Sequence, residues 1–199
     1  MLATSELREK VLRKSRESAA TQERFFSENA DRISECAAAM AAAFERGGKL
    51  FVMGNGGSLC DAQHLTVEFM HPIIEKRRAL PAMTLASETA LLTAVANDED
   101  FTLAFAKQLR LLARKGDIAL AISTSGKSAG VARALKAARE MELLTVGFTG
   151  RDGGSMLGAC DHCFVVPSFS IHRIQETHGT LLHVLWDLIH LHGGEEDVL

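Results

Sequence analysis

Five short apolar runs, spaced along the chain between helical patterns, limit what this sequence can fold into. They are LFVM at 50–53, PAMTLA at 81–86, IALAI at 118–122, LLTVGFT at 143–149 and HCFVVP at 162–167. The runs do not alternate between apolar and polar residues, so they predict strands that are buried on both faces of a parallel sheet. We therefore expect an α/β fold in which helices cover both faces of the sheet, a three-layer αβα sandwich.

Between the runs, apolar residues recur at helical spacing. This spacing predicts helices from Ser58 onward and at 88–96, 100–114, 128–140 and about 173–192. Residues 4–46 carry the same pattern, which we interpret as two helices broken near Ser27 to Asp31. The chain has no unusual linker and no internal repeat, so we expect one domain over 1–199, with N-terminal helices in 1–46 and an α/β core at 47–193.

The composition excludes several classes of protein. Hydrophobic residues make up 47% of the 199 residues and charged residues 24%, which rules out a disordered chain. A net charge of -3 gives no basic excess for binding a nucleic acid or an anionic membrane. There is no secretory apolar segment and no membrane-length run, so we expect a cytoplasmic protein. The few scattered cysteines agree with that compartment, and we interpret the Cys160 and Cys163 pair as ordinary packing residues.

Two loops that follow apolar runs are rich in small polar residues. In an open parallel sheet, ligands bind beyond the carboxyl ends of the strands, where such loops lie. The first loop is Gly54-Asn55-Gly56-Gly57-Ser58, in which glycines allow backbone N–H groups to approach a ligand closely. Leu59 stands where the dinucleotide-binding fingerprint needs a third glycine, so that motif is excluded.

The second loop is Ser123-Thr124-Ser125-Gly126-Lys127-Ser128. Its hydroxyls, its backbone N–H groups and the N-terminus of the following helix predict a site for one phosphate monoester. A nucleotide P-loop would need a glycine at the position of Ala121 and is excluded. For either loop alone, an ordinary capped turn between strand and helix is the alternative.

Three polar side chains form a further candidate group. His64 and Glu68 are four residues apart on the helix that begins at Ser58, so they share one face and can bind one metal ion or one substrate. His183 lies among leucines and valine in the last helix, and these neighbours predict that it is buried. A satisfied core histidine is therefore the alternative to a functional His183.

In order along the chain, these motifs resemble the sugar isomerase (SIS) domain family. The motifs are GNGGS, DAQH followed by Glu68, the Asn97-Asp98 pair, STSGKS, GRDGG at 150–154, and RIQE with a later histidine. Within that family the sequence is most similar to the phosphoheptose isomerases, which convert sedoheptulose 7-phosphate to D-glycero-D-manno-heptose 7-phosphate for surface glycans such as lipopolysaccharide. The resemblance implies a five-stranded parallel sheet, a homotetramer that uses the helices of residues 1–46, and active sites shared between subunits.

The resemblance also implies roles for individual residues. The family's substrate-contacting positions are matched by Asn55, Gly56, Gly57, Ser58, Asn97 and Asp98, and its phosphate-binding positions by Ser123, Thr124, Ser125 and Ser128. Its zinc positions, one Zn²⁺ per subunit, are matched by His64, Glu68, Gln175 and His183. Glu68 and Gln175 are also implied to contact the substrate, with Glu68 as base and His183 as acid in an isomerisation through an enediolate.

One geometric test applies to the implied zinc site. Eight residues of α-helix rise about 12 Å, so Gln175 and His183 are far apart if one straight helix carries both. We therefore expect either that Gln175 precedes the helix or that the ligands come from different subunits. Whether zinc is catalytic or mainly organises the site is open, because a carboxylate bound tightly to zinc is a poor base.

Two departures from the family pattern leave the sugar open. The segment Phe69-Met70-His71-Pro72 stands where the isomerases often have a Gly-Arg pair, and the next arginines are Arg77 and Arg78. His172 stands where they often have an acidic residue. The substrate is therefore heptose or a related sugar phosphate.

Two other functions are alternatives at this point. One is a non-enzymatic SIS protein of the kind that binds a bacterial replication initiator, and the other is a sensor of a sugar phosphate. Neither needs an intact set of His64, Glu68 and His183, and this chain has all three.

Overall fold

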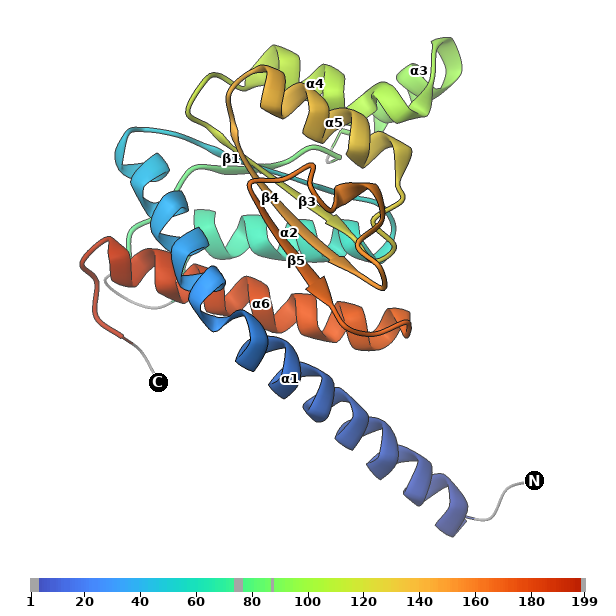
Figure 1. Cartoon of the computed structure of the whole chain (residues 1–199). Helices are drawn as coiled ribbons and strands as arrows, with labels where there is room; N and C mark the ends of the chain where they lie inside the picture. Colours follow the sequence, from blue (N-terminus) through green and yellow to red (C-terminus); the bar gives the residue numbers. More distant parts are fainter. Residues whose placement is uncertain (1–3, 74–76, 87, 198–199) are drawn as a thin grey trace.

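The computed structural model describes residues 4–73, 77–86 and 88–197 (Figure 1). All five predicted apolar runs form strands of one parallel sheet, in the order β2-β1-β3-β4-β5. The strands are β1 Leu50–Gly54, β2 Ala82–Thr84, β3 Ile118–Ser123, β4 Leu144–Gly150 and β5 His162–Val166. The predicted α/β class with a five-stranded parallel sheet is thereby confirmed.

Helices cover both faces of this sheet, as predicted. One layer consists of α1 Thr4–Glu45, α2 Gly57–Met70 and α6 Ile171–His192, and the other of α3 Thr89–Asp98, α4 Ala104–Leu112 and α5 Ala129–Glu140 (Figure 1). Two short 3₁₀ helices, η1 Phe101–Leu103 and η2 Gly154–Met156, join these elements. Along β1, Leu50 and Val52 belong to the core beneath α1 and α6, and Phe51 and Met53 to the core beneath α4 and α5. The strands are apolar throughout because both of their faces are buried.

The strand order places two polar loops next to each other. The chain runs from β1 outward to β2 and then returns to β3 on the other side of β1, so the order reverses between β1 and β3. The loops that follow these two strands are the two candidate ligand loops. A crevice between such loops is the usual ligand position in an open α/β sheet.

The predicted break in the N-terminal segment is wrong, because α1 is one continuous helix. The polar residues that suggested a break are accommodated within it. The side chain of Asn29 donates from Nδ2 to the carbonyl oxygen of Phe25, 2.9 Å away, and its Oδ1 accepts from Arg32 Nη1 at 2.8 Å. A polar side chain that bonds its own helix needs no helix end to satisfy it.

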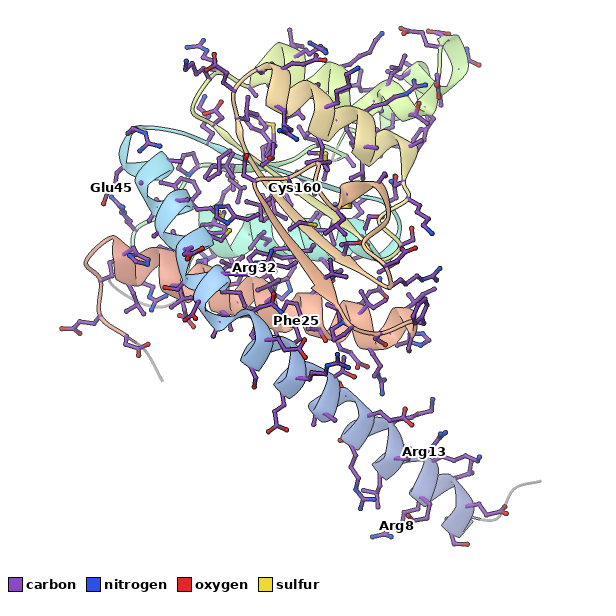
Figure 2. All side chains as sticks on the ribbon, viewed as in Figure 1. Arg8, Arg13, Phe25, Arg32, Glu45 and Cys160 are labelled. Carbon is purple, nitrogen blue, oxygen red and sulfur yellow. The ribbon has the colours of Figure 1, made fainter. Side chains whose placement is uncertain are left out.

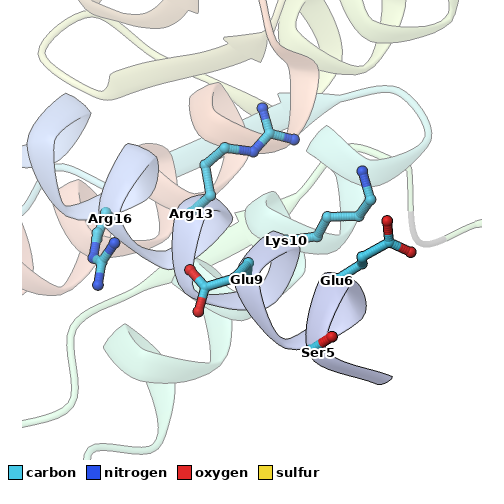
Figure 3. Close-up of a pocket in the computed structure, with 6 residues that line it drawn as sticks. All are labelled: Ser5, Glu6, Glu9, Lys10, Arg13 and Arg16. Atoms are coloured by element: carbon cyan, nitrogen blue, oxygen red, sulfur yellow. The ribbon is translucent and has the colours of Figure 1, made fainter. Parts of the chain in front are cut away.

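The two halves of α1 have different surroundings. Phe25 and Arg32 lie where the helix meets the rest of the molecule, whereas Arg8 and Arg13 stand on a part that projects away (Figure 2). Leu7 and Val11, one turn apart, are 50% and 66% exposed on the projecting part. A surface hollow there is lined only by side chains of this one helix, from Ser5 to Arg16 (Figure 3). The start of α1 is therefore an unpartnered helix surface rather than an enclosed pocket.

Within the described residues, every helix is too short or too polar to cross a lipid bilayer.

Candidate active site

The two candidate ligand loops are joined by a hydrogen bond. Asn55, which follows β1, donates from Nδ2 to Ser128 Oγ at 3.1 Å. Ser128 is the N-cap residue of α5, so this bond places the first loop beside the N-terminus of a twelve-residue helix. Gly56 has a left-handed backbone with φ +58°, a conformation that glycine adopts without strain. The structure thus brings the GNGGS and STSGKS motifs together at the strand-order reversal.

The loop of residues 123–128 packs closely against Gly153 and Ser155. Its Gly126 has φ +63°, and its N–H donates to the carbonyl oxygen of Ser123 at 3.0 Å. A Cβ at this position would overlap the carbonyl oxygen of Gly153. Ser155 donates from both N and Oγ to the Gly126 carbonyl, each at 2.9 Å. Gly153 of the GRDGG segment and Ser155 directly after it therefore support the shape of this loop, a role that the motif alone does not reveal.

His64, Glu68 and His183 converge from two helices. In α2, His64 Nε2 lies 3.2 Å from Glu68 Oε1, and the same nitrogen lies 3.3 Å from Nε2 of His183 in α6. The two imidazole rings meet edge to face with centroids 4.9 Å apart. One ligand atom from each of the three residues lies within 4.8 Å of the others. We call these three residues the His-Glu-His cluster.

The predicted burial of His183 is wrong. Its side chain is exposed, because it lies on the side of α6 that faces His64 rather than on the apolar side. The buried histidines of α6 are His178 and His190, neither of which the sequence singled out. His178 donates from Nε2 to the carbonyl oxygen of Thr149 at 3.1 Å, and burial lowers its pKa from 6.5 to about 4. His183 is therefore accessible to a ligand, whereas His178 is the core histidine, bonded through Nε2 and with its buried Nδ1 left without a partner.

The donor set of the His-Glu-His cluster fits a metal ion. Two imidazole nitrogens and a carboxylate oxygen are ligands that zinc binds in proteins. Asp61, one turn before His64, is a carboxyl group outside this set, and its Oδ2 is buried without a hydrogen-bond partner. Burial raises the pKa of Asp61, and the charge of nearby His64 opposes that rise. Asp61 is in the DAQH motif but was not predicted as a site residue.

Gln175 lies within α6, so the alternative that it precedes the helix is wrong. Its side chain packs against Gly57 at the start of α2, where a Cβ would overlap Gln175 Nε2. Ser58, the next residue, is 5% exposed. The structure therefore brings Gln175 to the GNGGS loop, two turns of α6 before His183.

The other predicted site residues lie apart from the cluster. Asn97 and Asp98 are exposed at the end of α3, in the opposite helix layer, where Asn97 Nδ2 donates to Asp98 Oδ1 at 2.7 Å. His71 and His172 are exposed, and Arg77 is buried in an ion pair with Asp187 at 2.8 Å. Arg77 is thus occupied in packing rather than facing a ligand loop.

Comparison with known proteins identifies the family. A family model described as an SIS domain matches residues 15–150. The phosphoheptose isomerase of Desulfovibrio desulfuricans is 48% identical over 173 residues, which are 87% of this chain and 82% of that protein. The chain belongs to the phosphoheptose isomerase family of SIS domain proteins. The family member of Thermodesulfovibrio yellowstonii is 41% identical over 194 residues, covering 98% of this chain and 94% of that protein.

A solved structure of the same family has the same fold. The phosphoheptose isomerase of Neisseria gonorrhoeae superposes with a TM-score of 0.86 at 36% identity, covering 92% of this chain and 98% of that one. Membership of this family makes the chain an enzyme, an isomerase, which decides against the non-enzymatic alternative.

Proposed function

We propose that this isomerase interconverts sedoheptulose 7-phosphate and D-glycero-D-manno-heptose 7-phosphate. The observation that carries the proposal is the meeting of His64, Glu68 and His183 in a chain that also joins two polar loops at the carboxyl ends of β1 and β3. A sugar phosphate needs acid and base groups at the carbonyl end and hydrogen-bond donors at the phosphate end. The chain carries both sets of groups, in separate elements.

The phosphate group is assigned to residues 123–128. Hydroxyl groups of Ser123, Thr124, Ser125 and Ser128 can donate to phosphate oxygens, and the positive end of the α5 dipole lies at the same loop. The glycine-rich loop of Asn55, Gly56, Gly57 and Ser58 is assigned to the sugar, together with Gln175, Asn97 and Asp98.

The proton transfers are assigned to Glu68 and His183. In the ketose-to-aldose direction, Glu68 removes a proton from C1 and returns it to C2. His183 donates a proton to O2 as the enediolate forms and removes the proton from O1 as the aldehyde forms. Each side chain therefore ends the cycle in its starting protonation state, as acid and base catalysis requires.

We assign one Zn²⁺ per subunit to His64, Glu68, His183 and Gln175. When bound, the ion supplies Lewis acidity that stabilises negative charge on the substrate oxygens. Because Gln175 lies in α6, we retain the alternative that the four ligands come from different subunits. A carboxylate has two oxygens, so binding through one leaves the other to accept a proton from carbon.

The projecting start of α1 supports a homotetramer with active sites between subunits. An isolated helix of three turns is marginal in water, and the exposed Leu7 and Val11 form a short apolar stripe on it. A second subunit packed on this stripe would stabilise it. Deletion of residues 1–13 should therefore lower the oligomeric state in light scattering, and an unchanged tetramer after deletion would exclude this role for the segment.

The experiment that tests the reaction is NMR of sedoheptulose 7-phosphate with the purified protein in D₂O. The proposal predicts formation of the aldose phosphate with deuterium at C2, because the proton removed from C1 exchanges with solvent before its return. Conversion with no solvent deuterium at C2 would argue against a solvent-exchanging base at Glu68. No conversion of this sugar at all would overturn the substrate assignment.

A further inference from the structure

The carbonyl oxygen of Glu68 has an unusual partner. Glu68 lies in the last turn of α2, where its helical hydrogen-bond donor would be the backbone N–H four residues later. That residue is Pro72, which has no N–H. Trp186 of α6 supplies the donor instead, with its Nε1 2.9 Å from the Glu68 oxygen. The sequence thus removes the local partner and the fold provides a distant one.

Trp186 is itself held on several sides. The guanidinium of Arg77 stacks on its ring, with Cζ 4.4 Å from the ring centroid. Arg77 donates from Nη1 to Asp187 at 2.8 Å and from Nη2 to the Glu196 carbonyl at 3.3 Å. The Arg77 side chain is only 2% exposed, so the stack on Trp186 is shielded from water, whereas Asp187 at the other end of the ion pair is 38% exposed.

His190 at the end of α6 also contacts the indole ring, and Glu195 of the C-terminal segment contacts His190. The ring of His190 meets Trp186 edge to face at 4.8 Å, and His190 Nδ1 lies 3.1 Å from Glu195 Oε2. The Phe69 ring, next to Glu68, stacks on His190 at 6.4 Å. We call Arg77, Trp186, Asp187 and His190 the Trp186 clamp.

The clamp lies next to the proposed acid and base. Trp186 is three residues after His183 on α6, and it bonds the backbone of Glu68 on α2. Glu68 and His183 belong to different helices, so their separation depends on how the end of α2 is fixed against α6. Among the described residues, the bond from Trp186 is the only side-chain-to-backbone hydrogen bond between these two helices.

We propose that Trp186, held by Arg77, is a positioning residue that sets Glu68 against His183 for proton transfer. The inference rests on the proposed function, in which these two residues are base and acid. A displaced reacting group can cost up to about a hundredfold in rate even when the fold is intact. The clamp therefore contributes to turnover without touching the substrate.

The first variant is Trp186→Phe, which removes the indole N–H and keeps an aromatic ring beneath Arg77. We expect kcat to fall about tenfold while KM changes less than about twofold, because a shifted base weakens the transition state more than substrate binding. The dissociation constant for zinc, measured by competition with a chelating dye, should rise at least about threefold because Glu68 belongs to the His-Glu-His cluster. The matched control is Phe164→Leu, which alters a buried aromatic residue of β5 and should lower only the melting temperature.

The second variant is Arg77→Lys, which keeps a positive charge but loses the planar stack and the paired donors. It should lower kcat about threefold. Because it leaves Trp186 in place, it tests the clamp even where Trp186→Phe folds poorly. A lowered melting temperature with kcat and zinc affinity within about twofold of wild type, in both variants, would overturn the proposal. If wild type converts no heptose phosphate, the substrate assignment fails, and the zinc dissociation constants still decide whether the clamp positions Glu68.

Discussion

The His-Glu-His cluster and the loop of residues 123–128 are built in opposite ways. The loop is one contiguous segment between β3 and α5, and its shape is fixed by backbone hydrogen bonds and by Gly153 behind it. The cluster joins α2 to α6, with His64 and His183 separated by 119 positions in the chain. A contiguous loop keeps its geometry locally, whereas a composite cluster depends on how two helices pack. Substitutions in the loop should therefore act mainly on binding, and substitutions at the cluster mainly on turnover.

The largest expected effect is on the cluster. Glu68→Gln keeps the shape of the side chain but cannot accept a proton from carbon, so kcat should fall about 10³-fold with KM changed by less than about threefold. Steady-state kinetics on sedoheptulose 7-phosphate measures both constants. The control Glu35→Gln, on an exposed part of α1, should match wild type. Retention of more than a tenth of wild-type kcat in Glu68→Gln would exclude Glu68 as the base.

The next effect is a loss of stability at low pH that is caused by His178, which links α6 to Thr149 in β4. Burial holds the pKa of His178 at about 4 in the folded protein, against 6.5 in an unfolded chain. Below pH 6.5 the unfolded chain binds the proton first, so stability falls from pH 6.5 to pH 4 and is unaffected above this range. The loss should reach about 3 kcal/mol from this group.

Urea unfolding of the metal-free protein at pH 7 and pH 4 measures that loss. His178→Gln can still donate to the Thr149 carbonyl and does not titrate, so its stability should change less over the same range. Equal pH dependence in the variant and in wild type would show that His178 is not responsible. Turnover at pH 7 should be the same in both, because His178 is neutral there.

A smaller effect is expected in the phosphate loop. Ser125→Ala removes one hydroxyl from residues 123–128 and should raise KM about tenfold while kcat changes less than about threefold, since a hydrogen bond to a charged group contributes about 1.5–3 kcal/mol. The comparison variant is Ser27→Ala on the exposed side of α1. A fall in kcat with unchanged KM in Ser125→Ala would contradict the division between binding loop and reacting cluster.

The smallest effect is at the contact between the GNGGS loop and α6. Gly57→Ala places a Cβ against the amide of Gln175, which is the flexible end of a side chain, so stability should hardly change. We expect a loss of about threefold in kcat/KM as the amide is displaced. Gly48→Ala is the contrast, because its Cβ would lie 2.7 Å from the Gly116 carbonyl oxygen and should cost about 1–3 kcal/mol of stability. Thermal unfolding and kinetics of both variants would show whether these effects separate.

The fold was largely predictable from the sequence because apolar runs and helical spacing are local patterns. The helix break near Ser27 was wrong because Asn29 bonds within its own helix, a contact that composition does not reveal. The prediction that His183 is buried was wrong because its position around α6 turns its side chain toward His64, and the apolar neighbours in the sequence do not reveal that position. The Trp186 bond to Glu68 joins residues 118 positions apart, and no local pattern predicts it.

The candidate site likewise has parts that the sequence predicts and parts that depend on tertiary packing. The two loops were recognisable because each is a short contiguous motif after a strand, and the structure brings Asn55 to Ser128. The pairing of His64 with His183 came from the family resemblance and not from spacing, because it requires the packing of α2 on α6. Asp61 and the GRDGG support of Gly126 were missed for the same physical reason.

Metal removal and restoration test the separation of cluster and loop most directly. The protein would be assayed by NMR for conversion of sedoheptulose 7-phosphate as isolated, after chelation, and after zinc is returned, with binding of inorganic phosphate measured in each state. We predict that conversion falls on chelation and returns with zinc, while phosphate binding stays unchanged because residues 123–128 hold no metal ligand. Full conversion by protein that metal analysis shows to be free of metal would contradict a functional ion at His64, Glu68 and His183.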